Sequence, residues 1–537
     1  MKNSIILFCL FFSAAVSAQQ NVTDTLNLSG KGMAAICSEI KNNPSIKSID
    51  LLKNTPSDWD SLFSCLSQLK QLGDLRITIS LSDFEKLKPE FQKMITGLQL
   101  TGTKLTGIPG SIIKQDQLTW LDFCGFCNEN SFADISPLSH LVHLKYLDLS
   151  SCNVSSLPAD IGNLAALEIL DLNNNMLTVL PSGIGKLTSL KSLILNNNRL
   201  ASIPPETGKL INLRLLDLKN NQLKELPSET CDMKSLKKLD ISNNQIKALP
   251  TAIGRLTSLT ELDLRNNQLS NIPSGIGNLT QLTGLYLSQN QISGLPSEIG
   301  KLQNLTKLYL RENKLISIPA EFCGFRWFTE LDLSHNKLTS LPSEIGRLNH
   351  LRSIDLSNNQ IRLLPAEIGK IDSLRWLVVS DNQLVSLPPE IGKLSYLSEL
   401  DLSGNKLKNL PEEISKLDSL SYLDLSNNEL VSIPAEIGKF TIFTELDLSN
   451  NQLTSVPAEI GKLVNLVSLD LSNNRLRSIP PEIGKLTGLT ELDLNNNQLK
   501  SLPPEIGNLT SLTWLTYDKE KIKKLPPAVQ KLLEKIK

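Results

Sequence analysis

The chain has 537 residues, a formal net charge of −1 and 40% hydrophobic residues, but only 5% aromatic residues. At roughly 150 residues per domain, this length suggests three or four ordinary domains. The 54 Lys and Arg against 55 Asp and Glu do not suggest a nucleic-acid binder, whose phosphate contacts need surplus basic side chains.

The first twenty residues have the pattern of a targeting segment. One basic residue, Lys2, precedes an apolar run from Ile5 to Val16, and small residues at 16–18 suit a cleavage site. The run is shorter than the ~20 apolar residues of a membrane span. We therefore predict a signal peptide over 1–18 rather than a membrane anchor. Since no later stretch is apolar enough to span a bilayer, we expect an exported mature chain.

A single repeat fills the rest of the chain. From Leu144 the pattern LxxLxLxxNxLxxLPxxIGxLxx recurs every 23 residues up to the unit that starts at Leu512, giving seventeen units without insertion or deletion. Looser units start at Ile46, Leu72, Ile95 and Leu118. We therefore expect an N-terminal cap with about five irregular repeats over 19–143, and regular repeats over 144–524.

The last thirteen residues, 525–537, break the pattern. Val529, Leu532, Leu533 and Ile536 have the spacing of one helix face, with charged residues on the other. We interpret this segment as a C-terminal capping helix that covers the last repeat. A role at a membrane surface is the alternative.

Physical chemistry explains why the units must stack. Each unit has seven apolar positions, and burying them contributes roughly 10–20 kcal/mol. Ordering 23 residues costs roughly 23–46 kcal/mol in backbone entropy, so one unit cannot fold alone but a stack can. The alternation LxxLxL fits a short strand. In the second half of each unit, opposite this strand, Pro rules out a central strand. We expect a one- or two-turn helix there, ended by Gly.

These motifs resemble those of the leucine-rich repeat family across essentially the whole mature chain. The segment LDLSNNQLTSVPAEIGKL at 446–463 is close to the family consensus, in the 23-residue class of Ras-suppressor-like and exported bacterial proteins. The resemblance implies an α/β solenoid shaped as a horseshoe or arc. It would have a parallel β-sheet on the concave face and short helices or 3-10 turns on the convex face. It implies no particular ligand.

The ninth position of each unit is Asn in fifteen of the seventeen units, the exceptions being Cys152 and Glu520. An Asn amide beside buried Leu must be satisfied by hydrogen bonds, and the family resemblance implies a ladder of such bonds to the backbone. We therefore assign a structural role to this column, which begins with Asn175, Asn198, Asn221, Asn244, Asn267 and Asn290.

The cysteines suggest one possible disulfide. In an oxidising compartment Cys37 and Cys65 can form a disulfide that stabilises the first repeats, where the core is thinnest. The CxxC at 124–127 follows a strand rather than opening a helix, which disfavours a redox role. Cys231 and Cys323 are isolated in the convex limb, and we expect buried small hydrophobic side chains there.

The sequence shows no sign of catalytic or metal chemistry. The HxxH at 140–143 is a weak metal signal in an irregular insertion, and no phosphate loop or zinc-type spacing is present. No stretch after Ala18 is long enough to hold a catalytic domain. We therefore predict a protein that is not an enzyme and has no metal site and no cofactor.

The third and fifth positions of each unit should point to the concave face. The fifth is Asp in twelve of seventeen units, and strands ~4.8 Å apart would align these into a column of like charges. One interpretation is that Asp is simply the consensus residue of the family at this position, and that neighbouring Lys and Arg partly neutralise the column. The other is an acidic surface for a basic partner or for cations.

Aromatic residues interrupt this column. Seven of the eleven Trp and Tyr occupy third or fifth positions; strands favour aromatics, but exposed Tyr, Trp and Arg also dominate protein interfaces. We therefore hypothesise a binding surface for a protein or glycan on the concave face, against the alternative of surface residues without a partner. Its candidate residues are Tyr286, Tyr309, Arg311, Lys307, Trp376 and Tyr422.

The leading hypothesis is an exported, non-enzymatic protein, secreted, periplasmic or attached to the cell surface, that acts in adhesion or host interaction. The family resemblance suggests this setting. One alternative is a Ras-suppressor-like signalling scaffold, and another is an effector with an unrecognised catalytic activity. The sequence leaves the ligand and the oligomeric state open.

Overall fold

The computed structural model describes residues 25–28, 31, 33–52, 54, 58–101, 107–123, 134–325, 327–440 and 442–536. It divides into two compact units, residues 1–239 and 240–537. The predicted signal peptide over 1–18 and the CxxC at 124–127 lie outside the described residues.

Short strands recur once per repeat. In unit 1 they are β1 (Thr25–Asn27), β2 (Ser48–Leu51), β3 (Asp74–Ser80), β4 (Gly97–Thr101), β5 (Trp120–Asp122), β6 (Tyr146–Asp148), β7 (Ile169–Asp171), β8 (Ser192–Ile194) and β9 (Leu215–Asp217), and β10 (Lys238–Asp240) ends at the boundary. In unit 2 they are β11 (Glu261–Asp263), β12 (Gly284–Tyr286), β13 (Lys307–Tyr309), β14 (Glu330–Asp332), β15 (Ser353–Asp355), β16 (Trp376–Val378), β17 (Glu399–Asp401), β18 (Tyr422–Asp424), β19 (Glu445–Asp447), β20 (Ser468–Asp470), β21 (Glu491–Asp493) and β22 (Trp514–Thr516).

Helices occupy the opposite limb of each repeat. The irregular repeats use α-helices: α2 (Met33–Asn42), α3 (Trp59–Leu66), α4 (Leu81–Lys86), α5 (Pro89–Gln92) and α6 (Gly110–Ile113). The last irregular repeat also has a 3-10 helix, η1 (Ser136–His140). The regular repeats use 3-10 helices throughout, which in unit 1 are η2 (Ala159–Asn163), η3 (Ser182–Lys186), η4 (Pro205–Lys209) and η5 (Ser228–Asp232). Those of unit 2 are η6 (Thr251–Arg255), η7 (Ser274–Asn278), η8 (Ser297–Lys301), η9 (Ala320–Gly324), η10 (Ser343–Arg347), η11 (Ala366–Lys370), η12 (Pro389–Lys393), η13 (Glu412–Lys416), η14 (Ala435–Lys439), η15 (Ala458–Lys462), η16 (Pro481–Lys485) and η17 (Pro504–Asn508), followed by α7 (Pro527–Leu533).

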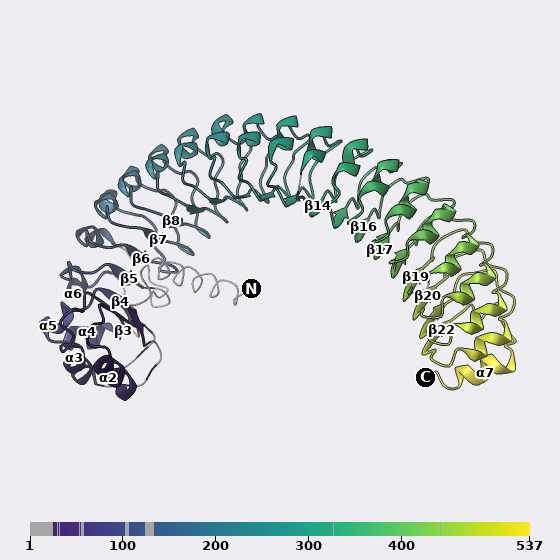
Figure 1. Ribbon diagram of the computed structural model, residues 1–537, viewed down its shortest axis with the longest axis horizontal. Coiled ribbons are helices and arrows are strands. Elements are labelled where there is room, and N and C mark those ends of the chain that lie inside the picture. Colours follow the sequence, from purple (N-terminus) through teal and green to yellow (C-terminus); the bar gives the residue numbers. More distant parts are fainter. Residues whose placement is uncertain are drawn as a thin grey trace. The chain divides into compact units, whose positions relative to one another are not determined.

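Each unit is a solenoid. From β1 to β9 and from β11 to β22, every strand pairs in parallel with the next, in a register set by the repeat. Within each unit the strands line the inner side of the curve and the helices lie outside (Figure 1). The Leu and Ile side chains of successive repeats fill the layer between them, as with Leu285, Leu287 and Ile299, which are 0% exposed.

The convex limb of the regular repeats has the short 3-10 turns that the family resemblance implies, each of five residues. One expected detail differs, because Gly lies inside the 3-10 helix rather than at its end, as Gly346 does in η10. The reason is a close approach between neighbouring helices. A Cβ on Gly346 would lie 2.5 Å from the carbonyl oxygen of Glu367 in the next helix, which is too close for any other residue without displacement.

The asparagine column forms a buried ladder. All six named asparagines are 7–9% exposed and donate to a backbone carbonyl of their own repeat over 2.9–3.1 Å. Asn290 also donates to Leu264 O at 2.9 Å and accepts from Leu269 N at 3.0 Å, both in the preceding repeat. The amide therefore ties adjacent turns together.

Both ends of the described stack are reinforced. Cys37 on α2 and Cys65 on α3 form a disulfide with a Cα–Cα distance of 5.8 Å. Farther along the chain, Cys152 in the first regular repeat is also disulfide-bonded. At the other end α7 packs against η17. Asp518 accepts from the backbone N–H groups of Asn496 and Asn497, and Lys521 Nζ donates to Asn497 O at 2.8 Å. These two side chains satisfy backbone groups that a further repeat would otherwise bond.

Candidate functional site

Two tyrosines lie side by side on the concave face of unit 2. Tyr286 ends β12 and Tyr309 ends β13, and the sheet register pairs them directly. Their ring centroids are 5.5 Å apart with an interplanar angle of 49°, a tilted arrangement within the range of favourable aromatic pairs. A Cβ on Gly284 would lie 2.8 Å from Tyr286 Oη. The ring therefore lies over this glycine, which leaves room for it.

An arginine covers the Tyr286 ring. The guanidinium carbon of Arg265 is 5.3 Å from the ring centroid, close enough for a cation–π contact. Asp263 holds the guanidinium in place by accepting from Arg265 Nε at 3.0 Å and from Nη2 at 2.5 Å. The hydrogen bonds to Asp263 raise the pKa of Arg265, and this effect outweighs burial, which lowers it.

A glutamate fixes the other tyrosine. Tyr309 Oη donates to Glu330 Oε2 at 2.5 Å, and Lys307 Nζ lies 3.4 Å from Glu330 Oε1. Burial raises the pKa of the Tyr309 hydroxyl, and the hydrogen bond to Glu330 and its charge add to this effect. The phenol therefore stays protonated and acts as a donor. We call Arg265, Gly284, Tyr286, Lys307, Tyr309 and Glu330 the tyrosine cluster.

Arg311 lies two residues beyond the end of β13, and its side chain contacts the adjacent Glu312. Its Nε is 3.1 Å from Glu312 Oε1, and Gln289 Nε2 donates to the other oxygen of Glu312 at 3.1 Å. The hydrogen bond from Gln289, followed by that from Arg311, lowers the pKa of Glu312. Arg311 thus lies at the rim of the cluster with its side chain 44% exposed.

The structure does not bring the remaining predicted residues to this cluster. Trp376 is on β16, three strands beyond β13, and is 38% exposed. Tyr422 is on β18, where burial, followed by the charge of Asp424, raises its pKa to about 12. Since strands lie ~4.8 Å apart, these two aromatic residues form separate contact points.

Sequence reasoning missed Arg265, Gly284 and Glu330. Arg265 occupies the seventh position, where most other repeats have Ser or Asn. This departure from the repeat could have identified Arg265 as a candidate from the sequence. Gly284 is likewise the one glycine at the third position among the regular repeats. Glu330 gave no signal, because Glu is common at its position and only the register places it beside Tyr309.

The aspartate column has a structural role. All twelve fifth-position aspartates accept from the backbone N–H two residues later, over 2.8–3.1 Å. This bond closes a turn whose next residue has a positive φ, as in Asn266 (52°) and His335 (54°), a conformation that Asn tolerates best after Gly. Asp thus serves the turn that ends each strand, which gives a physical reason for the consensus interpretation.

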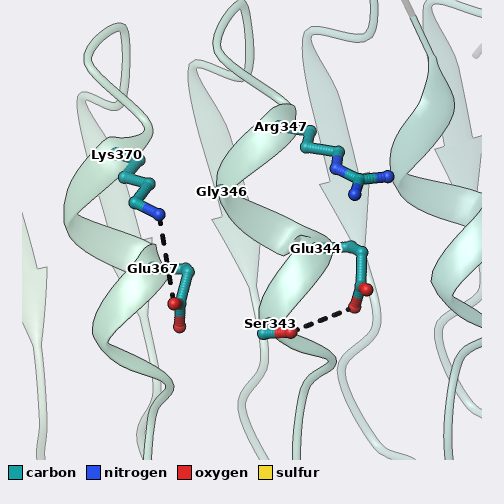
Figure 2. Close-up of a pocket in the computed structure, with 6 residues that line it drawn as sticks. All are labelled: Ser343, Glu344, Gly346, Arg347, Glu367 and Lys370. Atoms are coloured by element: carbon teal, nitrogen blue, oxygen red, sulfur yellow. Dashed lines mark hydrogen bonds and ion pairs between the residues drawn. The ribbon is translucent and has the colours of Figure 1, made fainter.

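The convex face of unit 2 has a shallow, polar depression. It measures about 230 Å³ and lies between η10 and η11, lined by Ser343, Glu344, Gly346, Arg347, Glu367 and Lys370. Ser343 Oγ donates to Glu344 Oε2 over 3.2 Å, and Lys370 Nζ lies 4.0 Å from Glu367 Oε1. Both contacts are drawn as dashed lines in Figure 2. Within the described ranges no three acidic, His or Cys side chains could hold a metal ion, and no helix there is long and apolar enough to cross a membrane.

Comparisons with known proteins agree with the repeat. A model described as a leucine-rich repeat region matches residues 114–205, 205–291, 328–400 and 367–456, and a second, described as a leucine rich repeat, matches 280–338, 441–499 and 464–522. No curated protein matches the chain in sequence.

Solved structures show the same fold. A leucine-rich repeat protein of Leptospira interrogans, LIC12759, is 36% identical with a TM-score of 0.57, over 73% of this chain and 95% of that one. The Arabidopsis receptor kinase HAESA, solved with the peptide hormone IDA and the co-receptor SERK1, is 28% identical with a TM-score of 0.64, over 93% and 92% of the two chains. The functional domain of InlJ from Listeria monocytogenes is 21% identical with a TM-score of 0.55, over 66% and 74%, and supports the fold alone.

Proposed function

Since the chain belongs to the leucine-rich repeat family, we propose that it is an exported, non-enzymatic protein that binds a protein partner at the tyrosine cluster. We assign it to adhesion or to interaction with a host or cell surface. Leucine-rich repeat domains are typically non-catalytic binding scaffolds, and this fold with its structural neighbours indicates a protein-binding role.

The observation that carries the proposal is the fixed geometry of the tyrosine cluster. Tyr286 and Tyr309 present half-buried aromatic rings, and Arg265 and Glu330 hold them in place. Tyr and Arg are the residues that most often anchor protein interfaces. Because their partners within the chain already order these side chains, binding costs less conformational entropy than it would with mobile ones.

A neighbour and a disulfide support the wider proposal. HAESA was solved with a peptide hormone, so a peptide or protein ligand suits this fold. The bond between Cys37 and Cys65 fits an oxidising compartment, as does the signal peptide predicted over 1–18. Cell fractionation with N-terminal sequencing tests the export. A mature chain that starts at Gln19 is expected, whereas an uncleaved cytosolic protein would favour the signalling scaffold.

Partner capture tests the site. The mature chain is used as bait against surface and extracellular proteins, alongside the double variant Tyr286→Ala and Tyr309→Ala. We expect the double variant to bind the identified partner at least ~10-fold more weakly, since each lost anchor is typically worth more than about 1 kcal/mol.

The matched control is Tyr396→Ala. Tyr396 is 62% exposed but lies in the turn before β17, outside the third and fifth positions. This variant should bind as the unaltered chain does. If the double variant keeps full affinity for every partner captured, or if Tyr396→Ala weakens binding equally, the tyrosine cluster is not the binding site.

A further inference from the structure

The concave face of unit 1 has a different chemistry from that of unit 2. At the third positions of β5, β6, β7 and β9 lie Trp120, Tyr146, Ile169 and Leu215, and Ile194 replaces Asp at the fifth position of β8. In unit 2 the third positions are mostly Glu, Lys or Ser. We call these five residues the apolar column. The register aligns Trp120, Tyr146 and Ile169, and then Leu215 beyond Ser192. Ile194 pairs instead with Asp171 and Asp217 on the neighbouring strands.

The apolar column is a packed surface. The rings of Trp120 and Tyr146 stack with centroids 5.0 Å apart and an angle of 14°. Ser192 occupies the third position of β8, between Ile169 and Leu215 in register. It is 2% exposed, and its hydroxyl has no hydrogen-bond partner in the described structure. Leu215 is itself only 6% exposed, so Trp120, Tyr146, Ile169 and Ile194, which are partly exposed, supply most of the accessible apolar area.

Basic side chains border the column where the strands begin. Lys145 and Arg214 immediately precede Tyr146 and Leu215, and both are exposed. Neither has an ion-pair partner among the residues described. Between them Lys191 Nζ lies 2.6 Å from Glu168 Oε2. Of the carboxylates on these strands, Asp122, Asp148 and Asp171 are 3–6% exposed, and Asp217 on β9 is partly exposed. A partner approaching β5 to β8 therefore meets apolar side chains bordered by the positive charges of Lys145 and Arg214.

We propose that the apolar column is a second docking surface, for an amphipathic helical segment of a partner protein that has acidic residues along one flank. Five strands ~4.8 Å apart span ~19 Å, and an α-helix rises ~5.4 Å per turn. One helical turn thus matches about one strand, so a helix of roughly 13 residues lying across the strands can place an apolar side chain over each of them. The acidic flank pairs with Lys145 and Arg214, which fixes the direction of approach.

A designed peptide tests this proposal. The probe is a labelled 14-residue amphipathic helix with Leu on one face and Glu on the flanks, titrated against the full mature chain by fluorescence anisotropy. A matched peptide has Lys in place of every Glu. We expect the acidic peptide to bind at least ~10-fold more tightly than the basic one, with a difference that shrinks at high salt.

Substitutions locate the binding surface. The double variant Ile169→Ser and Leu215→Ser introduces the residue found at the same position in β15 and β20. The double variant Lys145→Glu and Arg214→Glu alters only exposed side chains. It keeps the proposal testable if the first variant folds poorly. Each should weaken binding of the acidic peptide at least ~10-fold, while Tyr422→Ser, at the third position of β18 in unit 2, should leave it unchanged.

Three outcomes would overturn the proposal. They are equal binding of acidic and basic peptides, acidic-peptide binding that survives both double variants, and binding to phosphatidylglycerol vesicles without binding to the peptide. The last result would assign the surface to an anionic membrane instead. Because this surface shares no residue with the tyrosine cluster, loss of binding at one leaves the other proposal untouched.

Discussion

The carboxyl group of Asp171 experiences two opposing influences. It accepts hydrogen bonds from the backbone N–H of Asn173 at 2.9 Å and from Asn173 Nδ2 at 2.6 Å, which favour the ionised form. Burial to 3% exposure and the nearby charge of Asp148 oppose ionisation, and they raise its pKa to about 7. Asp171 shares β7 with Ile169 and pairs in register with Ile194 on β8.

This carboxyl group makes the stability of unit 1 depend on pH. Its folded-state pKa exceeds the unfolded value of 3.8, so the folded chain binds the proton more tightly. The stabilisation is fully present below about pH 4, is lost as pH rises towards 7, and is absent above it. We expect a higher urea unfolding midpoint at pH 5 than at pH 8.

Asp171→Asn should flatten this pH dependence, because an amide keeps the hydrogen-bonding shape without a titrating proton. Asp148, whose pKa burial also raises, should account for the part that remains. The control Asp160→Asn alters an exposed carboxylate in η2 and should leave the dependence as it was. A midpoint that is the same at both pH values in the unaltered chain would contradict the assignment.

At the scale of the element, the 3-10 helices are set by the space between repeats. Their Gly residues follow the buried Ile, and the next helix approaches within contact distance of the Gly Cα. A Cβ on Gly300 would overlap the carbonyl oxygen of Glu321. Cys231 and Cys323 occupy this same position and are 0% and 1% exposed, as expected of small buried side chains. Gly after Ile therefore permits the close approach of neighbouring helices, while η5 and η9 accommodate a small Cys side chain at the same position.

Gly300→Ala should destabilise unit 2 by about 1–3 kcal/mol, the usual cost of overpacking a filled site. Gly294→Ala is the matched control, because a Cβ there meets nothing within 4 Å. It should change the free energy of unfolding by less than about 1 kcal/mol. Denaturant unfolding of the two variants measures the difference, and equal midpoints would show that the helices move apart freely.

At the scale of the molecule, each repeat contacts mainly its neighbours, so stability is local. Among the described residues, β1 pairs with β2 and β22 pairs with β21, the terminal strands of the described repeats. The disulfide between Cys37 and Cys65 closes a loop with a sequence separation of 28 residues between α2 and α3. Asp518 and Lys521 serve the last repeat through hydrogen bonds instead.

Replacing Cys37 and Cys65 by Ser should therefore loosen one end without affecting the distant repeats. A loop of this length is worth roughly 3–4 kcal/mol in the chain-entropy treatment. Hydrogen exchange should accelerate in β1, β2 and β3, while the amides of β11 to β22 keep their protection and serve as the internal control. Uniform acceleration along the chain would mean that the solenoid unfolds as one cooperative body.

The sequence by itself determined the repeat, the strand positions, the asparagine ladder and the solenoid class. This was possible because a 23-residue period aligns like residues, and a buried amide or leucine has few permitted environments. Tertiary structure alone decided what the surfaces contain. Register places Glu330 against Tyr309 and Arg265 over Tyr286, and it buries Asp171 among apolar neighbours. Such contacts depend on side-chain directions across strands one repeat apart, which a period in the sequence does not specify.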